Sequence, residues 1–142
     1  MKWIDEVILG LIEVVGSNSI YDIISHLKIY VLSVEPDNYL LHGNRAVYNR
    51  IGDFECIYLA NDLSNKEFVL AHEVGHAILH VDEFETFYNP LLNKGKLENE
   101  ANYFATKLLY SDYELEEGIH TREQLADRLG IDIDFTKFIF GN

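Results

Sequence analysis

The sequence is poor in cysteine, in proline and in basic residues, and each shortage excludes a class of protein. The single cysteine, Cys56, excludes an internal disulfide bond. Two prolines, with no Pro/Gly-rich linker, repeat or low-complexity stretch, indicate one domain over 1–142, which would bury about two-thirds of its unfolded surface. Because lysine and arginine number 11 against 24 acidic residues, the net charge is −13, which disfavours direct nucleic-acid binding. Such a chain would instead attract a basic protein partner.

The N-terminal residues lack the pattern of a signal peptide. Charged residues already occur within residues 1–6, and the apolar run there is short and interrupted. We therefore expect a cytoplasmic protein without a membrane partner.

What the chain does contain is the run His72-Glu73-Val74-Gly75-His76. Two histidines four apart on a helix lie on the same face, so both imidazoles can reach one metal ion. The glutamate beside the first histidine can accept a proton from a metal-bound water and return it to a leaving amine. The run predicts two zinc ligands, His72 and His76, and a catalytic base, Glu73.

The residues around this run favour a buried helix at about 65–80. Most of its positions are apolar, and two histidines and a glutamate in such a helix would be costly without a partner such as a metal. Ser64 and Glu67 form a Ser-x-x-Glu capping box that would start the helix at about residue 65. Gly75 lowers helix propensity by about 1 kcal/mol relative to alanine, which suggests close approach by a neighbouring strand or backbone.

A catalytic zinc ion takes three protein ligands, so the third must come from another segment. A second helix at about 96–110 carries apolar residues at helical spacing. Glu98 borders that stripe and shares a face with Ala101 and Asn102, whereas Glu100 is expected to point toward solvent. We predict Glu98 as the third ligand and Asn102, one turn on, as a residue that hydrogen-bonds a ligand.

Other donors for the third position are less suitable. A metzincin would have glycine at 79 and histidine at 82, where this chain has Leu79 and Asp82. His80 shares the face of His76, but three ligands along one straight helix span about 12 Å, so we interpret His80 as a helix-end histidine favoured by the macrodipole. Cys56 could bind zinc as a thiolate, although its apolar, strand-like surroundings are typical of a small buried cysteine.

The overall pattern predicts an α+β fold, with a small antiparallel or mixed sheet packed on the active-site helix. Gly52-Asp53 suggests a hairpin between the last two strands. The expected elements are helices at about 3–15 and 20–27, strands at 29–34, 46–50 and 54–60, helices at about 65–80 and 96–110, and a helical hairpin at about 112–140.

The C-terminal stretch offers a rival function. Residues 121–131 open with a capping box and have the Ala-x-x-x-Gly spacing of a helix-turn-helix start. Residues 132–140 contain one lysine, no arginine and mostly apolar side chains, so they lack the contacts of a recognition helix. We interpret the stretch as a helical hairpin that packs on the core or holds a partner.

Two motifs together carry a resemblance to a known family. They are Ala-His-Glu-Val-Gly-His-Ala-Ile-Leu-His at 71–80 and, about 20 residues later, Glu98-x-Glu100-Ala101-Asn102-x-Phe104-Ala105-x-x-Leu108-Leu109. In both motifs and their spacing, the chain resembles the ImmA/IrrE family of zinc metallopeptidases, from about residue 29 to about 130. It departs from that family after Leu109, where Tyr110-Ser111 replace the usual Met-Pro.

The resemblance implies a single gluzincin-like zincin domain with Zn2+ on His72, His76 and Glu98, Glu73 as catalytic base, and a bacterial or prophage origin. It also implies proteolysis of a helix-turn-helix repressor that silences a phage, a mobile element or a stress regulon. In such folds an edge strand aligns the substrate by β-augmentation; 54–60 is our candidate, with a wholly internal strand as the open alternative. The alternative function is a metal-bearing anti-repressor that sequesters the repressor uncut, although binding alone needs no general base.

Overall fold

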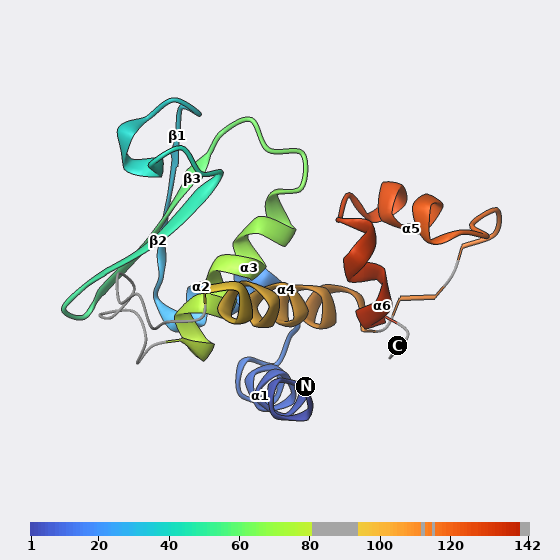
Figure 1. Cartoon of the computed structure of the whole chain (residues 1–142). Helices are drawn as coiled ribbons and strands as arrows, with labels where there is room; N and C mark the ends of the chain where they lie inside the picture. Colours follow the sequence, from blue (N-terminus) through green and yellow to red (C-terminus); the bar gives the residue numbers. More distant parts are fainter. Residues whose placement is uncertain (81–93, 112, 115, 140–142) are drawn as a thin grey trace.

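The computed structural model describes residues 1–80, 94–111, 113, 114 and 116–139 (Figure 1). Residues 112, 115 and 140 of the predicted C-terminal hairpin lie outside this part. The described chain is α+β, as predicted, with two N-terminal helices, a small mixed sheet, two crossing helices and a C-terminal helical unit.

Two N-terminal helices, α1 (Lys2–Val15) and α2 (Ile20–Leu27), form where apolar residues recur at helical spacing. α1 ends at Gly16, whose φ of 83° is a left-handed conformation that glycine adopts at little cost. Their apolar faces bury isoleucines, namely Ile4, Ile8, Ile20, Ile23 and Ile24. Within the described ranges no single helix is long and apolar enough to span a membrane. α1 and α2 taken together have the length and apolar composition of a membrane span, but a 77° bend separates them.

Three strands form the sheet, β1 (Tyr30–Val34), β2 (Ala46–Ile51) and β3 (Phe54–Ala60), in the order β1-β3-β2. A 3-10 turn, η1 (Tyr39–Leu41), lies between β1 and β2. β2 and β3 form the predicted antiparallel hairpin, turned at Gly52 with a φ of 59°. β1 pairs in parallel with the other side of β3. β3 is therefore internal, so the choice of 54–60 as an edge strand is wrong and the open alternative of an internal strand is confirmed. Among the described residues the edge strands are β1 and β2.

The helices α3 (Lys66–Leu79) and α4 (Lys94–Tyr110) cross at the centre of the molecule (Figure 1). A Cβ built on Gly75 would lie 3.1 Å from a ring carbon of Phe104 and 3.4 Å from the backbone of Ala101. The close approach predicted at Gly75 is confirmed, and the neighbour is the backbone of a helix. This contact lets side chains of α3 and α4 meet across a short distance.

The start of α3 differs from the prediction. The N-cap is Asn65, so Ser64 lies outside the helix, and the Ser64-x-x-Glu67 capping box is wrong. The Asn65 amide instead donates to the carbonyl of Gly130, at 3.5 Å. A contact with a distant segment has replaced the expected local cap, as tertiary context often does.

The C-terminal unit comprises α5 (Arg122–Leu129), η3 (Ile133–Phe135) and α6 (Thr136–Ile139). α5 opens with the predicted capping box. The Thr121 hydroxyl accepts from the backbone N–H of Gln124, and the Gln124 side chain accepts from the N–H of Thr121. Here the local sequence pattern and the structure agree.

This unit packs on the core, as one of the two interpretations of the stretch predicts. Phe135 stacks on Phe68 of α3 with ring centroids 5.8 Å apart, and Phe138 meets Tyr103 of α4 edge-on at 5.0 Å. α6 has four residues, of which two are buried. A recognition helix needs an exposed face of several turns, so this geometry disfavours DNA reading.

Candidate metal centre

Two histidines of α3 meet across one helical turn. His72 and His76 lie on the same face because they are four residues apart. Their Nε2 atoms are 3.1 Å apart, and their side chains are 15% and 13% exposed. The structure thus brings both imidazoles to one point.

The third predicted ligand reaches this point from α4. Glu98 Oε1 lies 2.7 Å from His76 Nε2, and Glu98 Oε2 lies 3.2 Å from His72 Nε2. One ligand atom from each of the three residues lies within 4.8 Å of the other two. The hydrogen bonds with His72 and His76 hold the pKa of the Glu98 carboxyl well below its usual range. Glu98 therefore offers a carboxylate to the cluster.

Asn102, predicted to hydrogen-bond a metal ligand, contacts the outer side of His72. Its Oδ1 lies 2.6 Å from His72 Nδ1. An amide oxygen only accepts, so Nδ1 donates its proton to Asn102, which leaves Nε2 as the nitrogen that faces Glu98 and could bind a metal. Burial acts to lower the pKa of His72, but the hydrogen bond and charge of Glu98, the charge of Glu73 and the Asn102 contact raise it overall.

Glu100 does not lie where the sequence predicts. The expectation that it points toward solvent is wrong, because Glu100 is only 6% exposed and its Oε1 lies 3.3 Å from His80 Nε2. His80 is at the end of α3, as interpreted, but it is also buried, and its Nδ1 lies 2.9 Å from His76 Nδ1. Sequence reasoning missed this pair. The sequence held a signal for His80 alone, which follows His76 by four residues and so shares its face of the helix.

The donor set suits a cation. Two imidazole nitrogens and a carboxylate oxygen converge within 4.8 Å of one another. A positive charge, either a proton or a metal ion, stabilises such a cluster of nitrogen atoms and an anionic oxygen. Three such ligands with room for a fourth are typical of a catalytic zinc site.

Glu73 lies beside the cluster, between α3 and the sheet. The backbone N–H of Tyr48 in β2 donates to its carboxylate. Burial raises the pKa of Glu73, while the charges of His72 and His76 and the Tyr48 hydrogen bond act in the opposite direction. A carboxyl group with a raised pKa, beside a metal site, is well suited to accept and release protons.

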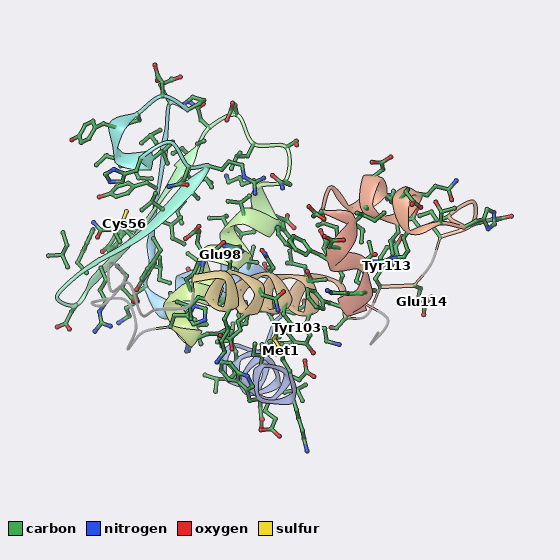
Figure 2. All side chains as sticks on the ribbon, viewed as in Figure 1. Met1, Cys56, Glu98, Tyr103, Tyr113 and Glu114 are labelled. Carbon is green, nitrogen blue, oxygen red and sulfur yellow. The ribbon has the colours of Figure 1, made fainter. Side chains whose placement is uncertain are left out.

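The cluster opens into a cleft of about 1280 Å³. Its walls come from β2, α3, the start of α4 and residues 130–135 of the C-terminal unit. Cys56 is buried on β3, where burial raises the pKa of its thiol, and among the described residues it does not join the ligand cluster. Figure 2 labels Glu98 at the start of α4 and Cys56 out on the sheet. The thiolate alternative therefore lacks support in the geometry.

Taken together, the α+β fold and a cluster of two histidines and a carboxylate that could hold a metal ion are typical of metal-dependent hydrolases. Comparison with known proteins identifies the family: residues 24–138 match the peptidase family described as the IrrE N-terminal-like domain, and the chain belongs to it. The chain is also similar to the metallopeptidase ImmA of Bacillus subtilis, with 31% identity over 134 residues that cover 88% of this chain and 76% of the relative. No solved structure matches the chain. The resemblance to ImmA/IrrE metallopeptidases is therefore confirmed.

Proposed function

We propose that this chain is a zinc-dependent endopeptidase with a zincin-type active site. The observation that carries the proposal is the convergence of His72, His76 and Glu98 within 4.8 Å on the wall of an open cleft, with Glu73 beside them. The first three residues would hold the ion. This donor set is one that zinc accepts readily, and it leaves one position open.

In this proposal the chain's own residues move the protons. When bound, zinc polarises the scissile carbonyl and makes water a stronger nucleophile. Glu73 accepts the proton of the attacking water and then passes it to the leaving amine. The Tyr48 N–H holds the Glu73 carboxylate toward the cleft during both transfers. Asn102 keeps the His72 ring in the tautomer that presents Nε2.

The strand that aligns the substrate in this proposal is β2. β3 is paired on both sides, whereas β2 has one edge with no strand partner among the described residues, packs against α3 and lines the cleft. An extended peptide can pair with such an edge through main-chain hydrogen bonds. Because the Tyr48 N–H reaches Glu73 from β2, a peptide on this edge would lie next to the base.

We further propose that the substrate is a basic helix-turn-helix repressor, cut at one or a few accessible sites. The net charge of −13 favours a cationic partner over most acidic proteins of the cytoplasm. Family membership supports a protein substrate. Cleavage between the repressor's DNA-binding and dimerisation parts would release it from DNA, in a bacterial cell or from a prophage.

The test is to incubate the purified zinc-loaded chain with the repressor encoded beside it and to identify fragments by mass spectrometry. Glu73→Gln should keep the fold and the metal but lose about 10²- to 10⁴-fold in cleavage rate, because an amide cannot transfer the proton. Glu67→Gln, an exposed change on the same helix, is the matched control and should cleave normally. Degradation of unfolded casein with the repressor intact would contradict the substrate. A repressor inactivated without cleavage, equally by Glu73→Gln, would instead establish the anti-repressor that sequesters its partner.

A further inference from the structure

We infer that Glu100 and His80 are positioning residues that fix the ring orientation and tautomer of His76 for metal binding. The inference rests on the proposed metal site. His80 and Glu100 are 3% and 6% exposed, so this pair is deeply buried behind the cluster, whereas the Glu98 side chain is 56% exposed. Neither residue contributes an atom to the ligand cluster itself.

The contacts form a continuous chain from α4 to the cluster. Glu100 Oε1 lies 3.3 Å from His80 Nε2, and His80 Nδ1 lies 2.9 Å from His76 Nδ1. The opposite nitrogen of His76, Nε2, faces Glu98 at 2.7 Å. His76 and His80 therefore each use both of their ring nitrogens in these contacts.

Only one arrangement of protons lets His76 bind a metal through Nε2. That atom must present a lone pair, so His76 carries its proton on Nδ1 and donates it to His80 Nδ1. His80 Nδ1 must then accept, which leaves the His80 proton on Nε2. The Glu100 carboxylate accepts from that Nε2–H and so stabilises the required tautomer.

The ring of His72 is oriented by a single residue, without an intervening histidine. Asn102 contacts its Nδ1 directly, and Asn102 is one turn from Glu98 on the same face of α4. Glu100 is two residues from Glu98 and so lies on the other side of that helix. It reaches the second ligand through His80, which shares a face of α3 with His76. Thus α4 supplies one metal ligand, Glu98, and two orienting oxygens. The Asn102 oxygen contacts His72 directly, and the Glu100 oxygen acts on His76 through His80.

Loss of the His80–Glu100 pair would have different effects if the pair were purely structural or if it positioned His76. A structural pair would affect stability alone. Loss of a group that orients a metal ligand typically weakens metal affinity by about 10- to 100-fold in the protein that remains folded. Zinc affinity of the folded chain is therefore the measurement that separates the two roles.

The experiment measures zinc affinity of the full chain by competition with a chromophoric chelator, with folding checked by circular dichroism. Glu100→Gln and His80→Phe should each bind zinc about 10- to 100-fold more weakly than the unaltered chain. Tyr103→Phe is the matched control, because it removes a 2.7 Å hydrogen bond from α4 to Asp5 and leaves the cluster untouched. Unchanged zinc affinity in either folded variant would overturn this inference but would leave the proposed function standing. Absence of zinc binding by the unaltered chain would overturn the proposed function as well.

Histidine nitrogen NMR of the zinc-loaded, unaltered chain gives a second test that needs no variant. We expect protonated Nε2 and unprotonated Nδ1 in His80, with the reverse protonation in metal-bound His76. This pattern supports the inference even if both variants fail to fold. A proton on His80 Nδ1 would overturn it, because His76 could then not donate along the chain.

Discussion

The α3–α4 crossing and the three-stranded sheet border the same cleft, but the sequence specifies them in different ways. At the crossing, the helical repeat alone determines which residues share a face, so His72 and His76 meet through their spacing. In the sheet, the role of β3 depends on pairing between Tyr30 and Cys56, which are far apart in the chain. The proposed chemistry therefore depends on local spacing, whereas the proposed substrate alignment depends on topology.

The largest expected effect concerns the crossing. The double variant His72→Ala/His76→Ala should lose the metal, whereas the unaltered chain should carry about one zinc ion, because Glu98 alone is a weak site. Elemental analysis of the folded proteins measures this. His26→Ala/His120→Ala, two exposed histidines elsewhere, is the control and should keep the zinc. Stoichiometric zinc in the first double variant would show that the ligands lie somewhere else.

The next effect tests how closely α3 and α4 must approach. Gly75→Val would place carbon atoms where even a Cβ is 3.1 Å from Phe104 and 3.4 Å from Ala101. Such overpacking should cost about 1–3 kcal/mol of unfolding free energy, measured by urea denaturation. Gly10→Ala is the control, because a Cβ there meets nothing within 4 Å and should stabilise helix α1 by up to about 1 kcal/mol. Equal stability of the Gly75→Val variant would mean that the helices can separate freely.

These contrasts show which parts of the molecule the sequence could predict. The helices, the hairpin at Gly52 and the convergence on Glu98 follow from periodicity, turn chemistry and short spacing. The burial of Glu100 could not be predicted the same way, because it depends on how α4 lies against His80 rather than on its own helical pattern. The internal position of β3 needed long-range strand pairing, which no local pattern encodes.

A smaller effect tests β2 as the docking edge. N–H groups two residues apart on a strand point the same way, so the Arg50 N–H lies on the same outer edge of β2 as the Tyr48 N–H, which donates to Glu73. Proline is tolerated at an edge strand, and Arg50→Pro should remove one donor to the substrate, lowering kcat/KM by about 2- to 10-fold. Arg50→Ala controls for loss of the side chain. Equal kcat/KM for the proline and alanine variants would argue against docking on this edge.

The smallest effect compares two capping motifs that look alike in the sequence. The Thr121 hydroxyl accepts from the N–H of Gln124, 3.1 Å away, whereas Ser64 lies outside α3 and caps nothing there. Because the Thr121 cap is exposed, Thr121→Ala should cost about 0.5–1 kcal/mol of unfolding free energy, at the lower end for helix caps. Ser64→Ala should stay within about 0.5 kcal/mol of the unaltered chain, as surface changes usually do. Urea denaturation of both variants measures the difference, and a larger loss for Ser64→Ala would mean that α3 starts at the residue its sequence motif suggests.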